Sequence, residues 1–536
     1  MKIFKSGRRG AVSVCSALAM AAVLSMPLAA QDLPSPFVQV VAAQASFDEA
    51  VAGYYRDRAY AAIWTDEASA ARRTALFATL SRAGDHALPV ARYDVAGLEA
   101  LLTSARTEGD RARAEVALTR AFLAYASDVK SGVLTPKRLD PGIVREIIRP
   151  EPAALLNALM AGDPAQIMRD LAPKAPHYAQ LMRAKLDLGA RIAQGGWGPT
   201  VSAKALVPGD SGVQVVALRN RLVAMGYLAP TATLIFDSAL QAAVLRFQLD
   251  HGLIADGSAY AGTLAEVNIA PETRMESIVV AMERMRWLGD TPLGDRHIWV
   301  NLPHFNAQVV DHGKVTFETR AVIGKNIADQ QTPEFSDVME HMVINPSWGV
   351  PRSIIVKEYL PLLQANRNAV SHLQVVDNKG RVIPRGSVNF AGYSARTFPF
   401  GMRQPPSNDN ALGLVKFMFP NQYNIYLHDT PAKNLFSQEV RAYSHGCIRL
   451  ADPFDFAYAL LAAQTDDPQG TFEGFLKTGR ESTVKLEQNL PVHLVYFTAF
   501  PGAKGQMMYR RDIYGRDAML FDALTEAGVA ISGVSG

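Results

Sequence analysis

The segment SHGCIRL, residues 444–450, surrounds one of only two cysteines in the 536-residue chain. Cys447 follows a histidine and a glycine, and a further histidine, His428, lies upstream in the segment QYNIYLHDT. A thiol beside an imidazole can act as a nucleophile, because the imidazole accepts its proton. The sequence therefore predicts a catalytic cysteine, Cys447, with His428 as its base.

The neighbours of Cys447 are suited to the same chemistry. Gly446 allows a tight turn, whose N–H groups can bind an oxyanion. Ser444 can orient a neighbouring group, and the guanidinium of Arg449 suits a carboxylate or backbone carbonyls. His445 is either part of the turn or a second imidazole near the thiol.

Three other readings of the cysteine are weaker. A zinc site from His428, His445 and Cys447 has no CxxC or HxxxH pair and no obvious fourth ligand. A thiol–disulfide oxidoreductase needs a second cysteine. A buried cysteine can also be a small apolar residue without chemistry, but the Ser-His-Gly sequence before it and the upstream histidine favour a function.

The elements around these residues are expected to place them at one cleft. As a strand, QYNIYLHDT puts apolar side chains on one face and Tyr426 and His428 on the other. The segment LADPFDFAYALLAAQ after the cysteine predicts a helix with Asp452 as its cap and Pro453 at its first position. We expect this helix start to lower the pKa of the Cys447 thiol.

The N-terminus predicts a secretory signal that contains the other cysteine, Cys15. The basic segment KIFKSGRR precedes an apolar run over residues 11–26 and the small residues LAA at 28–30. This pattern is typical of a cleaved signal peptide. The alternative is retention as a membrane anchor, which needs about 20 apolar residues.

Removal of this segment changes the charge and the cysteine count. The net charge of +3 comes from 54 basic and 51 acidic residues, and loss of the four N-terminal cations leaves 50 against 51, or −1. The charge therefore gives no reason to expect a nucleic-acid partner. Cys447 becomes the only thiol of an exported chain, so it cannot form an internal disulfide.

The remaining chain predicts a multidomain α+β protein. Helical spacing over 46–192 indicates a scaffold, and the segment RFQLDHGLIADG resembles the core of a three-helix peptidoglycan-binding module. Period-two patterns from His297 onward indicate a mainly β domain, interrupted by a polar interval read as a lid subdomain. The predicted boundaries are 1–30 (signal peptide), 31–200 (helical scaffold), 201–270 (peptidoglycan-binding-like domain), 271–355 and 411–505 (catalytic domain), 356–410 (lid) and 506–536 (C-terminal extension).

SHGCIRL and the upstream His428 resemble the active-site signature of L,D-transpeptidases with a YkuD-type catalytic domain. The stretches TPEFSDVMEHMVINPSWGVPRSI and RQPPSNDNALGLVKFMFPNQYNIYLHDTP look like the large YcbB-type subgroup of that family. The resemblance implies acyl transfer on peptidoglycan without a metal or cofactor. Cys447 would form a thioester with a donor tetrapeptide as D-Ala leaves, and a second stem would resolve it into a 3→3 cross-link.

The resemblance also implies substrate contacts and a setting. Arg449, Tyr426, Trp348 and Asn345 are the candidate substrate-binding residues, and ordinary packing is the alternative for Tyr426 and Trp348. The implied partners are peptidoglycan stem peptides and other wall-synthesis proteins, in the periplasm and with residual inner-membrane anchoring as an alternative. Carbapenems are expected to acylate Cys447.

Two alternative functions share the thioester chemistry, and a third has no catalytic chemistry. Water as the acceptor would make the protein an L,D-carboxypeptidase, and a lipoprotein lysine would make it an anchoring or releasing enzyme. A non-catalytic wall-binding scaffold is the alternative from another class, and it would not need both Cys447 and His428.

Overall fold

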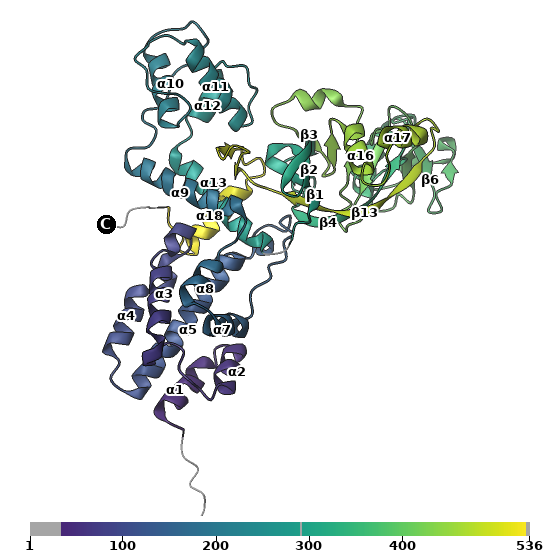
Figure 1. Ribbon diagram of the computed structural model, residues 1–536. Coiled ribbons are helices and arrows are strands. Elements are labelled where there is room, and N and C mark those ends of the chain that lie inside the picture. The colour runs from purple at the N-terminus through teal and green to yellow at the C-terminus, as the bar shows by residue number, and fades with distance from the viewer. Residues whose placement is uncertain (1–33, 290–291, 532–536) are drawn as a thin grey trace, which may run out of the picture.

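The computed structural model describes residues 34–289 and 292–531. Two helical lobes and one β-rich lobe meet at a central group of helices (Figure 1). The predicted signal peptide and Cys15 lie outside the described residues. Within the described ranges, no helix is long and apolar enough to span a membrane.

The N-terminal helical lobe has its own hydrophobic core, formed by residues from Phe37 to Leu171. Its longest helix, α5, begins with a capping box between Thr107 and Asp110 and ends at Gly132, which has a φ of 87°. The helical spacing of this segment and the stop signal at Gly132 predict the C-terminal end, and the structure adds the capping box at the start. The helices are α1 (Pro36–Ala45), α2 (Glu49–Asp57), α3 (Ala70–Leu80), α4 (Val95–Ser104), α5 (Glu108–Ser131), α6 (Pro136–Leu139), α7 (Pro152–Ala161) and α8 (Pro164–Asp170).

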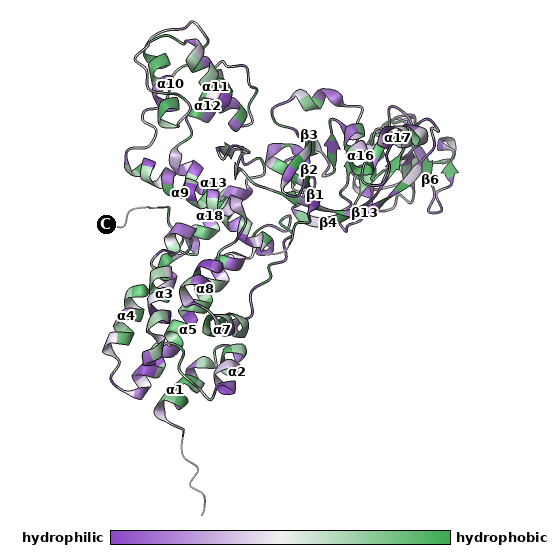
Figure 2. Cartoon of the chain, viewed as in Figure 1, coloured by the Kyte–Doolittle hydropathy of each residue, from purple (hydrophilic) through white to green (hydrophobic). Residues whose placement is uncertain are grey.

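The second helical lobe is smaller and has a separate core. It contains α10 (Val213–Ala224), α11 (Ser238–Asp250) and α12 (Ala261–Val267). Leu218, Leu240 and Val244 are fully buried in its centre. In Figure 2 the helices of both lobes carry apolar and polar residues side by side, which is the pattern of helices with one buried face.

A central core joins the three lobes. Its helices are α9 (Pro176–Ala193), α13 (Pro271–Leu288) and α18 (Arg516–Glu526). Residues of the hairpin β14 (Ala499–Pro501) and β15 (Met507–Tyr509) are buried in the same cluster. The C-terminal segment therefore packs into the middle of the protein, where α18 contacts α13.

A nine-stranded sheet forms the β-rich lobe, in the order β11-β3-β12-β10-β9-β4-β13-β1-β2. The terminal strand β2 also pairs with β3, so the sheet closes on itself. Helices α16 (Pro453–Leu461) and α17 (Pro468–Leu476) pack against it. The strands are β1 (Arg296–Asn301), β2 (Asn306–Asp311), β3 (Lys314–Gly324), β4 (Phe335–Ile344), β9 (Val415–Met418), β10 (Leu427–His428), β11 (Ala442–Ser444), β12 (Ile448–Leu450) and β13 (Ser482–Val495).

A subdomain inserted between β4 and β9 has its own core, which includes Trp348, Leu363 and Phe398. Its main elements are β5 (Trp348–Gly349), α14 (Arg352–Ile354), the π-helix η5 (Ile355–Tyr359), α15 (Leu360–Ala365), β6 (Gln374–Val376), β7 (Val382–Ile383) and β8 (Gly401–Gln404). The predicted lid, 356–410, makes up most of this lid subdomain, which also includes β5, α14 and Ile355 ahead of that interval.

Two details of the predicted strands are wrong. The period-two pattern from His297 to Gly324 predicts two extended runs around a turn at 311–313, but this segment forms three strands, since a 3₁₀ turn over Leu302–His304 separates β1 from β2. In QYNIYLHDT only Leu427 and His428 are in a strand, and Asn424 has a left-handed backbone with a φ of 54°. Asparagine tolerates this conformation better than most residues.

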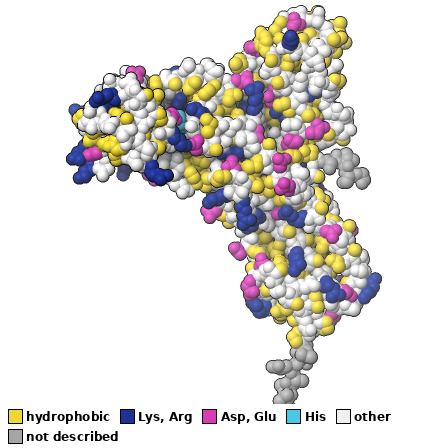
Figure 3. Space-filling model, turned by 180° about the vertical axis from the view of Figure 1, so that it is seen from behind, with side chains coloured by type: hydrophobic (Ala, Val, Ile, Leu, Met, Phe, Trp, Pro, Cys, Tyr) yellow, Lys and Arg dark blue, Asp and Glu magenta, His cyan; other side chains and the backbone are white. Residues whose placement is uncertain are grey.

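The surface carries charges of both signs. In Figure 3 basic and acidic side chains are interspersed over all three lobes on the face shown. No single-sign field covers that face, in keeping with the nearly balanced charge of the sequence.

Candidate active site

Strands β10 and β12 bring Cys447 and His428 to one face of the sheet. They pair in parallel, with Leu427 opposite Ile448 and His428 opposite Arg449. Leu427 and Ile448 are fully buried in the core, so the residues next to them in sequence point to the opposite face. The residues on that face are Tyr426, His428, Cys447 and Arg449.

Lys416 is a fifth residue of this face, and it was not among the predicted site residues. Strand β9 pairs with β10 so that Lys416 lies opposite His428. Val415 and Phe417, on either side of it, are fully buried. A lysine between two apolar residues in LVKFMF was the available signal, because it puts the cation on the face opposite the core.

The Cys447 thiol is half-buried and protonated at neutral pH. Its S–H donates to the carbonyl oxygen of Asn424 at 3.5 Å. Burial raises the pKa of the thiol to about 11. Hydrogen bonds from the N–H and hydroxyl of Tyr426 and the positive charges of Arg449 and Lys416 oppose this rise.

The position of Cys447 corrects one expectation. The cysteine leads directly into strand β12, and helix α16 begins only at Pro453. The predicted helix start is therefore not next to the thiol. The expected lowering of the pKa is wrong, because desolvation dominates at this position.

The imidazole of His428 is neutral at pH 7, so one ring nitrogen is free to accept a proton. Burial, followed by the charge of Arg449, lowers its pKa to about 3. Nδ1 lies 2.5 Å from the carbonyl oxygen of Asp429. A carbonyl only accepts hydrogen bonds, so Nδ1 carries a proton here, and the carbonyl of Leu412 is a second hydrogen-bond acceptor beside the ring.

The thiol and the imidazole share a face without a direct hydrogen bond in the described structure. The thiol hydrogen bond runs to Asn424, and the imidazole bond runs to Asp429. Catalytic hydrogen bonds are often absent before substrate binds. The resting pair is thus a thiol and a neutral imidazole.

Ser444 and Gly446 shape the turn before the cysteine. The buried hydroxyl of Ser444 donates to the carbonyl of Cys447 at 2.5 Å and accepts the N–H of Gly446 at 3.1 Å. Gly446 has a φ of 114°, and a Cβ there would approach Ile425 to 3.1 Å. A side chain would therefore strain this turn.

His445 points to the lid. Its Nε2 lies 2.6 Å from Oε1 of Glu358, in the π-helix η5. A second ion pair joins Lys357 of the same helix to Asp329 in the loop after β3. The lid subdomain thus contacts the cysteine turn and its neighbouring loop through two adjacent residues.

Arg449 is available to a ligand, whereas Asn345 is not. The Nε of Arg449 is buried without a hydrogen-bond partner. The amide nitrogen of Asn345 donates to the carbonyls of Phe475, Leu476 and Arg480, at 3.1–3.3 Å. Asn345 is therefore held at the end of α17 and does not face the cleft.

Tyr426 links the catalytic face to the lid. Its ring lies 5.6 Å from that of His428, centroid to centroid, and it packs against the hydrophobic core of the lid. Trp348 is a buried member of that core, with 9% of its surface exposed. The structure thus favours packing for Trp348 and a position beside the thiol for Tyr426.

A separate cavity lies away from the thiol. It has a volume of about 830 Å³ and opens between α9, the second helical lobe and the β14–β15 hairpin. Its lining includes Trp197, Tyr227, Arg183, Asp187 and Arg191. Within the described ranges, no three His, Cys, Asp or Glu side chains are grouped closely enough to hold a metal ion.

Three sequence families match the chain. Residues 295–471 match the "L,D-transpeptidase catalytic domain" (YkuD). Residues 49–184 match the "Scaffold domain", and residues 211–266 match the "Putative peptidoglycan binding domain".

One relative and two solved structures are also similar. A Haemophilus influenzae protein named "Putative L,D-transpeptidase" is 31% identical over 262 residues, which are 48% of this chain and 50% of that protein. The chain thus spans about half the length of this relative. L,D-transpeptidase structures from Xylanimonas cellulosilytica and Stackebrandtia nassauensis are 15% and 17% identical, with TM-scores of 0.17 and 0.21. Each comparison covers 55% of this chain, and 100% and 96% of those chains respectively. At these scores the two structures add nothing to the assignment.

Proposed function

Because the chain belongs to the L,D-transpeptidases with a YkuD catalytic domain, we propose that it forms 3→3 cross-links in peptidoglycan through a thioester on Cys447. The observation that carries the proposal is the shared sheet face, which presents a thiol, a neutral imidazole and a guanidinium whose buried Nε has no hydrogen-bond partner. These groups supply a nucleophile, a base and a carboxylate-binding cation.

The first half-reaction forms the thioester. As a donor tetrapeptide binds, Nε2 of His428 takes the proton of Cys447 and the sulfur attacks the carbonyl that precedes the terminal D-Ala. The N–H groups of the turn stabilise the oxyanion. The C–N bond then breaks, and the imidazolium gives its proton to the departing D-Ala amine.

The second half-reaction transfers the acyl group to the side-chain amine of diaminopimelate on another stem. His428 takes a proton from this amine as it attacks the thioester, and the imidazolium gives that proton to the sulfur when the C–S bond breaks, which regenerates the thiol. Arg449 and Lys416 give the cleft a positive charge, which suits the carboxylates of the stems. A stem analogue without carboxylates would not be attracted to the cleft by these two cations.

The domain content supports peptidoglycan as the substrate and a site of action outside the cytoplasm. We propose the periplasm, with export directed by residues 1–30. The YcbB-like subgroup is proposed on the order of scaffold, binding module and catalytic domain. L,D-carboxypeptidase activity and attachment of a lipoprotein lysine differ only in the acceptor.

The test is the product spectrum with disaccharide-tetrapeptides as the only substrate. We expect mass spectrometry to detect dimers whose mass equals that of two tetrapeptide units minus one D-Ala, with free D-Ala in equal amount. Tripeptide monomers without dimers would contradict cross-linking and support carboxypeptidase activity instead. Unchanged substrate would contradict both.

We also propose that the cavity beside Trp197 binds the glycan strand. Its volume suits a ligand of several sugar-sized units, and the partly exposed rings of Trp197 and Tyr227 offer apolar faces between charged side chains. The second helical lobe, which supplies Tyr227, matches the peptidoglycan-binding family.

We expect Trp197→Ala to weaken binding to purified sacculi about fivefold, because aromatic contacts contribute about 1 kcal/mol each. Sedimentation of the protein with sacculi measures this affinity. Tyr260→Ala is the matched control, since Tyr260 is 52% exposed in the same lobe and does not line the cavity. Equal affinities of the two variants would contradict glycan binding in this cavity.

A further inference from the structure

Thr332 is a fully buried residue that ties the cysteine turn to the rest of the catalytic domain. It lies in the loop between β3 and β4, far from Cys447 in the sequence. Its hydroxyl donates to the carbonyl oxygen of Gly446 at 2.7 Å and accepts the N–H of Gly324 at 3.0 Å. One side chain thus connects the loop, the end of β3 and the turn.

The bond to Gly446 fixes the peptide that carries the N–H of Cys447. In a trans peptide the C=O and the N–H lie in one plane and point in opposite directions. Holding the Gly446 oxygen against the buried Thr332 therefore directs the Cys447 N–H to the opposite side of the peptide. Oxyanion donors depend on such fixed orientation.

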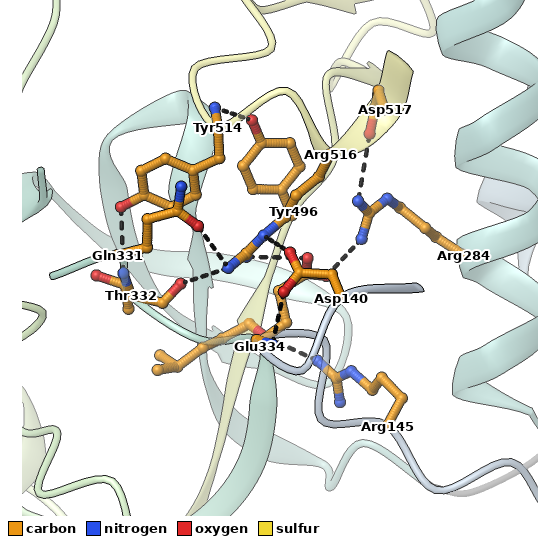
Figure 4. A network of polar contacts seen from close by, with 12 residues as sticks. Asp140, Arg145, Arg284, Gln331, Thr332, Glu334, Tyr496, Tyr514, Arg516 and Asp517 are labelled. Carbon is orange, nitrogen blue, oxygen red and sulfur yellow. Dashed lines mark hydrogen bonds and ion pairs between the residues drawn. The ribbon is translucent and has the colours of Figure 1, made fainter. Parts of the chain in front are cut away.

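The main chain of Thr332 is itself held by the C-terminal segment. Its N–H donates to the hydroxyl of Tyr514 at 3.2 Å, and this hydroxyl donates to the carbonyl of Gly324 at 2.6 Å. Its carbonyl accepts a hydrogen bond from Nη2 of Arg516 at 3.3 Å. Figure 4 shows Tyr514 and Arg516 approaching Thr332 from the C-terminal segment.

Arg516 connects this arrangement to the helical scaffold. Its Nε is 3.0 Å from Oδ2 of Asp140, and its Nη1 is 3.1 Å from Oε1 of Glu334. Glu334 also pairs with Arg284 of α13 at 2.5 Å. These buried charges compensate one another (Figure 4), so they form a rigid network rather than isolated polar groups.

We infer that Thr332 is a positioning residue for acyl transfer, which orients the Gly446–Cys447 peptide under the control of Tyr514 and Arg516. The inference rests on the proposed thioester chemistry. It gives the C-terminal segment a role in catalysis without contact with substrate. The helical scaffold is connected to the same network through the ion pair of Asp140 with Arg516.

The test compares two reactions of Cys447 in the full-length protein. Acylation by a carbapenem passes through an oxyanion, whereas alkylation by iodoacetamide does not. We expect Thr332→Val to slow acylation about 10- to 100-fold, as for a misplaced oxyanion donor, and to leave the alkylation rate within about twofold. Thr332→Ser keeps the hydroxyl and should restore acylation, while Tyr514→Phe should give a smaller loss.

Thr319→Val is the matched control, because the buried Thr319 hydroxyl bonds to Asp452 and not to the turn. It should leave both rates unchanged. Equal acylation by wild type and Thr332→Val, or equal slowing of acylation and alkylation, would overturn the inference.

Hydrogen exchange measured by mass spectrometry tests whether Thr332 holds the cysteine turn in place, and it needs no activity assay. The peptide covering residues 441–450 should exchange faster in Thr332→Val than in Thr319→Val. Equal exchange would overturn the role of Thr332. A wild-type protein that neither acylates nor cross-links would instead contradict the proposed function, and the exchange result would still decide on Thr332.

Discussion

Replacing Cys447 by alanine is expected to abolish both cross-linked dimers and the carbapenem adduct. The loss should be at least about 10⁴-fold, as for other enzymes that lose their nucleophile. Tyr426, on the same sheet face, is a poor substitute nucleophile, because burial raises the pKa of its phenol well above the usual value. Intact-mass spectra and the tetrapeptide assay measure the two losses.

The variant should keep the fold. Cys447 is only half-buried, and the turn is held by Ser444 and Thr332 rather than by the thiol. A melting temperature within a few degrees of the wild type is the control. Dimers in undiminished amount, from a protein without this thiol, would show that the chemistry belongs to another residue.

The order of the lobes follows from local patterns in the sequence. The apolar spacing and Gly132 predict the long helix α5, and a turn signal at His251-Gly252 predicts the C-terminal end of α11. Such signals act within a few residues of one another, so they need no knowledge of tertiary contacts.

The support of the site depends on long-range contacts that no local pattern encodes. Thr332 and Gly446 are 114 residues apart in the chain, and Arg516 and Asp140 are 376 residues apart. The C-terminal segment is an extension by its position in the sequence, but its arginine and tyrosine lie in the interior. Only the folded structure shows that these residues meet behind the cysteine turn.

The proton states could not be predicted either. The motif predicted a thiol activated by a helix, but the pKa of a thiol depends on the solvent and charges around the sulfur. Here partial burial of the thiol and full burial of the imidazole favour the neutral form of each group. This makes proton transfer at the moment of attack, rather than a preformed thiolate, the expected route.

His428→Asn is therefore expected to lower the carbapenem acylation rate about 1,000-fold, within the range for removal of a general base. The asparagine amide can still donate to the carbonyl of Asp429, in place of Nδ1, but it offers no basic nitrogen at the position of Nε2. Stopped-flow or mass-spectrometric acylation rates at pH 7 measure the effect.

The pH dependence separates the loss of a base from a structural defect. With pKa values of about 11 for the thiol and about 3 for the imidazole, the wild-type acylation rate should stay nearly constant from pH 5 to pH 9. Iodoacetamide needs the thiolate, so its rate should rise about tenfold per pH unit over the same range in both proteins. A plateau of alkylation near pH 7 that disappears in His428→Asn would reveal a preformed thiolate–imidazolium pair instead. Burial of an unpaired thiol and an unpaired imidazole argues against that pair, because each neutral form is the one that desolvation favours.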